Sequence, residues 1–535
     1  MKRGHWIGGA ALAAVLALTS APSIAADPPP LRIAMTLADI PLTDGAPDQG
    51  TEGIRFLGYT VYDPLIMWDL SSTDRPAQLV PGLATSWRQD ERDPSRWIFE
   101  LRQGVHFHDG SLFDADALVW NLDRALNEAS PQFDRGIRTQ TIASLWPIVA
   151  YRKLDDSHVE LQTKGVDTTM PFLLNRFLIA SPAQWEKVGR DWQAFRRNPS
   201  GTGPWRLKEF IPRQRAELLR NEAYWNPARV PKTERMILLP MPDASTRTAA
   251  LLSGSVDWAE LPAPDAVPKL KQSGFTVATN AIPHVWPYSF NVLPGSPYAD
   301  VRVRKALNLA VDRDGMVNLL GGLAIPAAGQ VAANDPWFGA PQFKIRYDPD
   351  EARRLLKDAG YDEKHPLKFK AAISTSGSGQ MYPLVMNEIV QQNLKEVGVD
   401  MQVEVFEWQA LLNLARGGAT SPEGRDLGAI NNSWNTMEPY NAFVRFADSQ
   451  LVPPKGNNWG YINDAELDAL VAEARRTSAG PQLDAILARI NTRMVDQAYF
   501  LWVVHDVWPT ALSPRVKGFI HPKSWYVDFS TVTVQ

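Results

Sequence analysis

Tryptophans with amide, hydroxyl or acid neighbours occur at three places in the second half of the chain and offer the chemistry of a small-ligand site. The candidates are Trp434 with Asn431, Asn435 and Glu438, Trp408, and Trp286 with Tyr288. An indole presents a flat apolar face on which a ligand can stack, and amides orient a ligand through hydrogen bonds. Packing in a protein core is the alternative for each of these aromatic side chains.

Metal-binding and catalytic chemistry find little support in the sequence. His106 and His108 would share one face of a strand beside Asp109, which is superficially a metal site, but such a pair also packs or faces solvent in a turn. The chain has no cysteine, so thiolate metal sites, disulfides and cysteine nucleophiles are excluded. HExxH, GxSxG and EF-hand motifs are absent. We therefore expect no metal, no cofactor and no enzyme, and keep a hydrolase with two carboxylates as the alternative.

The glycines at positions 201 and 203 invite a phosphate-loop interpretation. The third glycine and the lysine of that motif are missing, so phosphate binding is rejected. Two prolines in the same stretch stop any helix. We interpret residues 198–205 as a boundary between two units, followed by a strand that begins at Trp205.

Several elements can be predicted from local pattern. Alternation of apolar and polar residues over 97–101 predicts a half-buried strand. Asp114 is placed to cap a helix that carries Leu118 and Leu122 on its buried face. Asp464 is placed in the same way before a second amphipathic helix.

Composition sets the outer bounds. A chain of 535 residues is long enough for two to four domains of about 150 residues each. An apolar content of 44% supports substantial cores, and a net charge of −4 argues against a nucleic-acid binder.

The N-terminus has the pattern of a secretory signal peptide. Lys2 and Arg3 precede the apolar run 7–18, and small residues at 23–25 offer a cleavage site. Cleavage after Ala25 is expected, with Ala26 as the alternative. Because no cysteine follows, the mature protein should not be a lipoprotein and should be periplasmic.

The block "LVPGLATSW" (79–87) followed by "FELRQGVHFHDGSLFDAD" (99–116) closely resembles the signature of the family 5 extracellular solute-binding proteins. These are the dipeptide- and oligopeptide-binding components of ABC importers. Further matches to the family pattern are "GTGPW" (201–205), "NEAYW" (221–225) and "SGSVD" (253–257). The resemblance spans nearly the whole mature chain.

This resemblance implies an α/β, bilobal periplasmic-binding-protein fold of type II, in the large three-domain variety. Lobe one would comprise residues 31–50, 198–283 and 506–535, the extra domain 51–197, and lobe two 284–505. Alternating helix and strand patterns in the later half fit an α/β lobe independently. The implied role is a receptor that closes on a small solute, peptide class foremost, and delivers it to an inner-membrane ABC permease with its ATPase. It would act as a monomer.

The resemblance places Trp408 and Trp434 in the ligand pocket, but the charged residues around them differ from the family pattern. Peptide binders have an aspartate just after the second tryptophan, where this chain has Asn435. Oligopeptide binders have an arginine where this chain has Asn431. Dipeptide binders have an arginine in a stretch that here reads Ser374 to Gln380 and includes Ser376.

Neutral hydrogen-bonding groups at these positions would leave a zwitterionic dipeptide without counter-charges, which is costly in a buried site. A neutral or modified ligand, such as an oligosaccharide, an opine or a metal chelate, is therefore an alternative to a peptide.

Glu438 would be either a substitute ammonium anchor or a structural residue. The serine-rich stretch 374–380 would be either a pocket wall or a surface loop. We expect a Trp434→Ala variant to lose ligand-induced closure with its fold intact. A secreted hydrolase and a chemoreceptor partner are further alternatives for the whole protein.

Overall fold

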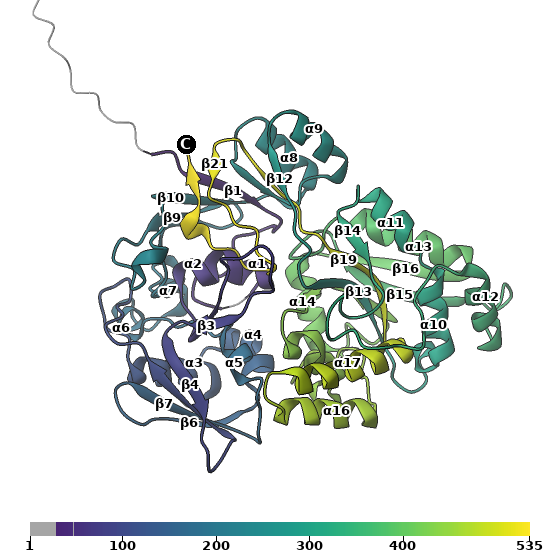
Figure 1. Ribbon diagram of the computed structural model, residues 1–535, viewed down its shortest axis with the longest axis horizontal. Helices are drawn as coiled ribbons and strands as arrows, with labels where there is room; N and C mark the ends of the chain where they lie inside the picture. The colour runs from purple at the N-terminus through teal and green to yellow at the C-terminus, as the bar shows by residue number, and fades with distance from the viewer. Residues whose placement is uncertain (1–27, 47) are drawn as a thin grey trace, which may run out of the picture.

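Three β-sheets organise residues 28–46 and 48–535, the part of the chain that the computed structural model describes (Figure 1). The first half of the chain lies on the left of Figure 1 and most of the later half on the right, while the C-terminal segment crosses back to the left. The predicted signal peptide, residues 1–25, lies outside the described residues.

The first sheet has seven strands and takes them from both ends of the chain. Its order is β12-β20-β11-β1-β10-β9-β8. The bounds are Leu31–Met35 (β1), Trp205–Ile211 (β8), Arg215–Arg220 (β9), Arg235–Pro240 (β10), Trp258–Glu260 (β11), Thr276–Ala278 (β12) and Thr510–Leu512 (β20). β1 runs parallel to β10 and β11, and β20 runs antiparallel to β11.

Both faces of the first sheet are covered. Ile33 on β1 packs in one apolar cluster with Phe56 of the helical segment 51–61, whereas Ala34 packs with Leu251 in another cluster. Successive residues of a strand point to opposite faces, so these two clusters lie on opposite sides of β1.

The second sheet also has seven strands, and its order is β14-β19-β13-β17-β15-β16 with β18 paired to β13. The bounds are His284–Phe290 (β13), Ala324–Pro326 (β14), Leu367–Ser374 (β15), Val399–Phe406 (β16), Ala429–Asn431 (β17), Trp434–Asn435 (β18) and Phe500–Asp506 (β19). Every residue of the central strands β13 and β19 is buried. A strand buried on both faces loses the alternation that would reveal which residues face a ligand.

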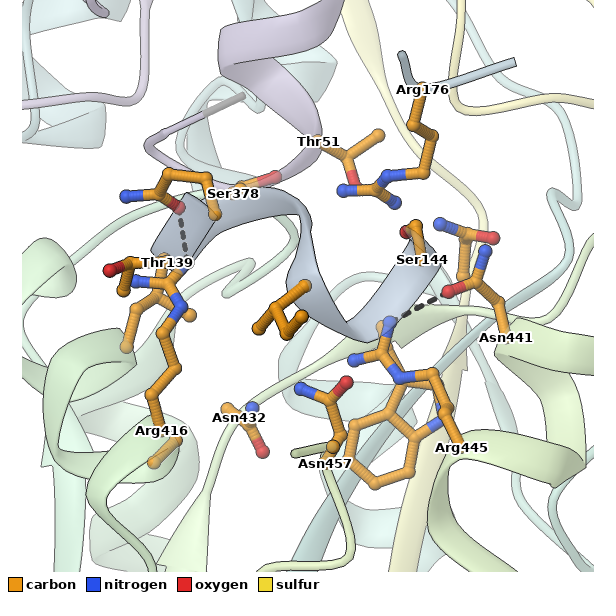
Figure 2. A pocket seen from close by; sticks show the side chains of 18 of the residues that line it. Thr51, Thr139, Ser144, Arg176, Ser378, Arg416, Asn432, Asn441, Arg445 and Asn457 are labelled. Carbon is orange, nitrogen blue, oxygen red and sulfur yellow. Dashed lines mark hydrogen bonds between the residues drawn. The ribbon is translucent and has the colours of Figure 1, made fainter. Parts of the chain in front are cut away.

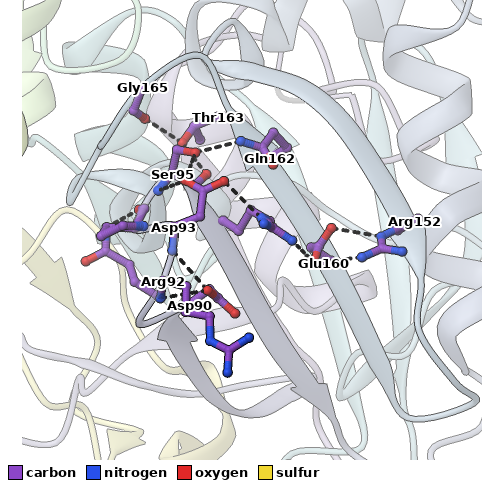
Figure 3. Close-up of polar contacts among 12 residues, drawn as sticks. Asp90, Arg92, Asp93, Ser95, Arg152, Glu160, Gln162, Thr163 and Gly165 are labelled. Carbon is purple, nitrogen blue, oxygen red and sulfur yellow. Dashed lines mark hydrogen bonds and ion pairs between the residues drawn. The ribbon is translucent and has the colours of Figure 1, made fainter.

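The third sheet is antiparallel, in the order β4-β5-β7-β6. The bounds are Ala84–Gln89 (β4), Arg96–Leu101 (β5), Ile148–Lys153 (β6) and His158–Thr163 (β7). Its edge and loops carry a polar network in which Arg152 pairs with Glu160 at 2.8 Å and Gln162 donates to Ser95 at 2.6 Å (Figure 3). Two short ribbons complete the β-structure, β2 (Ile66–Trp68) with β3 (Leu79–Pro81) and β21 (Val516–Lys517) with β22 (Thr533–Val534).

Helices flank these sheets (Figure 1). In the first half they are α1 (Thr51–Gly53), α2 (Tyr59–Val61), α3 (Ala115–Leu126), α4 (Arg135–Leu145), α5 (Met170–Leu174), α6 (Pro182–Lys187), α7 (Trp192–Arg197), α8 (Ala244–Leu252) and α9 (Val267–Gln272). In the second half they are α10 (Val301–Ala310), α11 (Arg313–Leu319), α12 (Pro349–Asp358), α13 (Pro383–Glu396), α14 (Trp408–Gly417), α15 (Arg445–Ala447), α16 (Ala465–Arg476) and α17 (Pro481–Asp496). Residues 54–58 and 440–444 form π-helical turns.

The elements predicted from local pattern are confirmed. The side chain of Asp114 accepts a hydrogen bond from the backbone N–H of Ala117 and begins α3. The side chain of Asp464 accepts from the N–H of Leu467 and begins α16. The strand expected over 97–101 is β5, with Trp97, Phe99 and Leu101 buried and Glu100 exposed. Side-chain capping and strand alternation act over a few residues, so local sequence decides them.

The glycines of the 198–205 boundary serve close backbone packing. A Cβ on Gly203 would lie 2.4 Å from the carbonyl oxygen of Thr60, and one on Gly201 would lie 2.2 Å from that of Val61. Both positions therefore accept only glycine without a shift of the backbone. Packing against the 59–62 segment explains this glycine pair without a phosphate ligand.

Two segments connect the first and second sheets, residues 279–283 between β12 and β13 and residues 507–509 between β19 and β20. The strands of the first, third and second sheets fall within the ranges predicted for lobe one, the extra domain and lobe two, but the domain boundaries themselves stay predictions. The helical segment 51–61, which was placed in the extra domain, packs with the core of the first sheet. None of the described helices combines the length and apolar character needed to cross a membrane.

Candidate functional site

A cavity of about 580 Å³ lies between the parts of the molecule built on the first and third sheets and the part built on the second sheet. One side of the cavity is formed by residues 50–51, the α4 residues between 138 and 144, and Arg176 after α5. The opposite side is formed by α14, by residues 432–435 around β18, by residues 440–445 and by residues 454–457. His284 and Trp525 complete the lining. Figure 2 shows ten of the lining residues, labelled, gathered around α4.

Direct contacts join the two sides around the cavity. The indole N–H of Trp408 donates to the carbonyl oxygen of Gln49 at 3.2 Å. Arg416 donates to Oε1 of Gln140 at 2.7 Å, a bond drawn in Figure 2. Arg475 on α16 pairs with Asp167 at 2.5 Å. These contacts exist only when the two sides are close together, so the structure has the geometry of a receptor closed around its site.

Helix α14 supplies one wall through its spacing. Glu407 caps the helix by accepting from the N–H groups of Gln409 and Ala410. Trp408, Leu412 and Arg416 then follow at intervals of four residues, which places them on one helical face, and all three line the cavity.

Trp434 and Trp525 bring aromatic surface to the cavity. The ring of Trp434 lies 4.0 Å, centroid to centroid, from that of Phe446 and 5.6 Å from that of Phe500, and only 4% of the residue is exposed. The indole N–H groups of Trp434 and Trp525 are buried and have no hydrogen-bond partner among the described residues. Both are therefore free to donate to a bound solute.

Positive charge is the main electrostatic feature of the lining. Arg138, Arg176, Arg416, Arg445 and Lys455 line the cavity, and no aspartate or glutamate is among the lining residues that the structure describes. Burial, together with repulsion by Arg176, lowers the pKa of both Arg416 and Arg445 to about 10. The charges are nevertheless retained at neutral pH. The neutral groups at the exchanged family positions are thus accompanied by cations from other segments of the chain.

The structure brings together three of the nine predicted site residues, Trp408, Trp434 and Asn435. Trp286 and Tyr288 are 0% and 1% exposed in the core of the second sheet. Asn431 is buried and donates to the carbonyl oxygen of Pro287 at 2.9 Å. These three do not line the cavity because β13 and β17 are central strands covered on both sides, and we no longer propose them as ligand contacts.

Ser374, Ser376 and Glu438 also lie outside the lining. Ser374 ends β15 with its side chain fully buried, and Ser376 is 7% exposed. The two carboxylate oxygens of Glu438 accept from the backbone N–H groups of Tyr440 at 2.6 Å and Asn441 at 2.8 Å. Both oxygens thus hold the start of the 440–447 helical segment, which carries Arg445, and we propose this structural role for Glu438. Of the serine-rich stretch, only Ser378 lines the cavity.

The histidine pair of the turn motif does not assemble a metal site. His108 is partly buried with Nε2 2.9 Å from the carbonyl oxygen of Gly203, and burial lowers its pKa to about 4. Its neighbour His106 instead pairs with Leu112 across an isolated bridge. Among residues 28–46 and 48–535 no group of three or more potential metal ligands occurs.

Residues 78–450 match the family model of the bacterial extracellular solute-binding proteins, described as "family 5 Middle". The chain belongs to this family. The chain is 27% identical to heme-binding protein A of Haemophilus influenzae over 506 residues, 89% of this chain and 87% of that protein. It is 28% identical to the glutathione-binding protein GsiB of Escherichia coli K12 over 456 residues, 84% and 85% of the two chains.

The periplasmic binding protein DppA from Helicobacter pylori, which is ABC transporter-associated and was solved in complex with the peptide STSA, superposes on this chain with a TM-score of 0.81. The superposition covers 95% of this chain and 98% of that one at 21% identity. The predicted bilobal binding-protein fold and the predicted role of solute receptor for an ABC importer are confirmed. Family 5 members are binding proteins and not enzymes.

Sequence reasoning missed the four arginines of this family 5 pocket. Arg416 had a usable signal, because it stands two helical turns after Trp408 on a helix whose cap can be predicted. Arg445 and Arg138 also lie on helical elements but outside the motifs that drew attention to Trp434. Arg176 follows the short helix α5 and has no local signal.

The buried carboxyl of Glu438 predicts a pH dependence of stability. Burial raises the pKa of Glu438 from 4.5 to about 7. The folded protein thus binds this proton more tightly than the unfolded chain, and the resulting stability is present at low pH and lost as pH rises towards and through 7. Relative to Glu438→Gln, which cannot titrate, the wild-type protein should lose on the order of 2 kcal/mol of unfolding free energy between pH 5 and pH 8.

Denaturant unfolding of both ligand-free proteins at these two pH values measures the difference. Asp48, Glu52 and Asp506, whose pKa values burial also raises to about 7, titrate in both proteins and cancel in the comparison. A constant difference across the pH range would show that Glu438 is ionised throughout.

Proposed function

We propose that this chain is a periplasmic receptor that captures a small solute in the cavity between its two sides and delivers it to an inner-membrane ABC permease with its ATPase. One observation carries the assignment to this site: the 580 Å³ cavity is lined by residues of both sides, which also touch around it. The names of its relatives support the solute role, since they bind heme, glutathione and a peptide.

Closure supplies the mechanism of capture. A ligand shifts an equilibrium between open and closed forms only through contacts that differ between them. A solute in this cavity would contact α4 and Arg176 on one side and α14, Trp434 and the 440–445 segment on the other, and both sets are present together only in the closed form. The closed shape would then be what a permease recognises.

Location and state complete the proposal. The N-terminal signal pattern supports export without lipid attachment, and we propose that the mature protein acts as a monomer and has no catalytic activity. No carboxylate belongs to the described lining, so the paired acids that a glycoside hydrolase needs are missing from this cavity. A peptide remains the ligand class suggested by the family resemblance.

A bulky side chain introduced into the cavity tests whether the solute binds there. Ala415 on α14 lines the cavity and Ala410 on the same helix is exposed. The mature protein is first unfolded and refolded to remove any carried ligand. It is then screened against a panel of peptides, glutathione, heme, opines, oligosaccharides and metal chelates. Ala415→Trp should abolish the thermal stabilisation that any ligand of this panel gives to the wild-type protein. Ala410→Trp should leave it intact. A ligand at 100 times its dissociation constant stabilises by about 2.7 kcal/mol, which such a screen resolves.

Equal stabilisation of wild type and Ala415→Trp would place the ligand elsewhere. Turnover of any panel compound would overturn the assignment as a receptor without catalysis.

A further inference from the structure

The cations of the cavity differ from the other buried arginines of this protein. Arg55 pairs with Glu260 at 2.7 Å, and Arg124 pairs with Asp134 at 2.8 Å. Arg313 has no acid partner, but its guanidinium donates five hydrogen bonds, four of them to backbone carbonyl oxygens. These three arginines thus have acid or carbonyl partners, although the Nε of Arg55 and that of Arg124 are buried without a partner among the described residues.

The cavity arginines have N–H donors without an acceptor among the described residues. Arg445 makes one side-chain hydrogen bond, to Asn441 at 2.7 Å, and its Nε is buried without a partner among the described residues. The side chain of Arg176 has neither a hydrogen bond nor an ion pair to any residue that the structure describes. Arg416 donates only to the amide oxygens of Gln140 and Asn413. These arginines are half-buried and line a cavity whose described lining has no carboxylate, so their unused donors are available to an anionic acceptor from outside the chain.

Two buried acids behind the wall do not provide that acceptor. Asp48 and Glu438 interact electrostatically with Arg416 and with Arg445, respectively, but neither forms an ion pair with a cavity arginine. The oxygens of Glu438 are occupied by backbone N–H groups, and one oxygen of Asp48 accepts from the N–H of Leu42. Burial raises both carboxyl pKa values to about 7, which weakens their negative charge further.

The cavity arginines come from both sides of the cavity. In Figure 2, Arg176 and Arg445 both lie on the right of the view, above and below Ser144, while Arg416 lies on the left. Arg138 and Arg176 come from the side of the third sheet, and Arg416 and Arg445 come from the side of the second sheet. Closure without a ligand therefore brings like charges together across the cavity.

We propose that the solute carries at least two separated negatively charged groups, one held by Arg176 and Arg445 and the other by Arg416, and that this charge draws the two sides together. The inference rests on the proposed function of the cavity and names its ligand class. Planar guanidinium groups suit carboxylate and phosphate equally in geometry, so the shared chemistry is a dianion of either kind.

The remaining polar groups agree with an acceptor-rich solute. Trp434 and Trp525 each offer a buried, unpartnered indole N–H, which can donate but not accept. A free dipeptide would bring an α-ammonium group into a wall without a described carboxylate. The same wall thus favours a solute with two acids and disfavours one with a free amine.

The test compares matched probes on the refolded mature protein. Linear dicarboxylates of increasing length, bisphosphonates of the same lengths, the corresponding diamides and a zwitterionic dipeptide are titrated by calorimetry and thermal shift. Dianions of one or both kinds should bind, with affinity that falls as ionic strength rises, and diamides should not. Carboxylate and phosphate ligands are distinguished by which series binds.

Single variants locate the two anion sites. Arg176→Gln, Arg445→Gln and Arg416→Gln should each weaken dianion binding about 10- to 100-fold, because each loses a charge-assisted hydrogen bond. Arg190→Gln changes the net charge equally but removes an exposed arginine paired with Glu186, and should bind as wild type does. Relief of repulsion should keep the unfolding midpoints of the three ligand-free cavity variants at or above the wild-type value.

Binding of diamides or oligosaccharides that is equal to or tighter than that of every dianion would overturn the inference. Failure of every dianion to raise the unfolding midpoint above that of its diamide would overturn it as well. In either case the proposed receptor function would still hold if Ala415→Trp no longer bound the neutral ligands and Ala410→Trp still bound them. Dianion binding unaffected by all three glutamine variants would assign the charge recognition to other residues.

Discussion

Glu260→Ala is expected to lower the free energy of unfolding by about 3–5 kcal/mol, because it leaves a buried arginine without its counter-charge. Glu260 ends β11 and is 0% exposed. Its Oε1 accepts from Arg55 at 2.7 Å and from the indole of Trp258 at 2.6 Å. Its Oε2 accepts from Arg55 at 3.2 Å and from the indole of Trp508 at 3.0 Å.

The position of this carboxylate gives the variant a second expected effect. Arg55 lies in the helical segment that follows Gly50 and Thr51 of the cavity wall, and Trp508 lies in one of the two segments that connect the sheets. Loss of Glu260 should therefore loosen the connection between the sheets as well as destabilise the fold.

Denaturant unfolding, followed by tryptophan fluorescence and far-ultraviolet circular dichroism, measures this loss. Glu186→Ala removes an exposed carboxylate that pairs with Arg190 and serves as the matched control, with an expected change of at most about 1 kcal/mol. Equal midpoints for Glu260→Ala and the control would show that water or a rearranged partner reaches Arg55.

Trp434→Ala is expected to cost about 3–5 kcal/mol of unfolding free energy, because it removes a nearly fully buried ring from an apolar cluster. The ring of Trp434 packs on Phe446 at 4.0 Å and lies near Phe500. This packing revises the expectation from sequence that the variant keeps an intact fold. Loss of solute binding by Trp434→Ala could therefore come from the missing ligand contact or from the destabilised fold.

Trp434→Phe separates packing from ligand contact. Phenylalanine retains an aromatic ring against Phe446, so the stability loss should be smaller, about 1–2 kcal/mol. It removes the indole N–H, which has no partner among the described residues. If that group donates to the solute, Trp434→Phe should weaken binding about tenfold, as measured by calorimetry, while the protein remains folded. Wild-type affinity in Trp434→Phe would limit Trp434 to a packing role.

Family membership and several individual elements could be predicted from sequence because they rest on local signals. The signature block 79–116 contains a strand with alternating burial and a helix capped by Asp114, and both form as predicted. The strand predicted to follow glycines 201 and 203 begins at Trp205, although the physical reason for the glycines, backbone contact with residues 60 and 61, appears only in three dimensions.

Predicted site residues line the cavity where a motif and the cavity coincide, and lie outside it where distant segments bury them. Trp408 and Trp434 line the cavity, whereas Trp286 and Tyr288, equally aromatic and next to polar residues, are core residues. The difference is that β13 is covered on both faces, which its sequence alone does not reveal.

The sequence by itself determined the family, the sheet-and-helix class and the capped helices, and it singled out two aromatic residues that line the cavity, because these depend on patterns within short segments. Only the tertiary structure decided the charge of the pocket. Arg138, Arg176, Arg416 and Arg445 come from segments far apart in the chain, and each taken alone has the pattern of an ordinary helix or loop arginine. Electrostatic character depends on distances between charges, and only the folding of distant segments onto one cavity sets those distances.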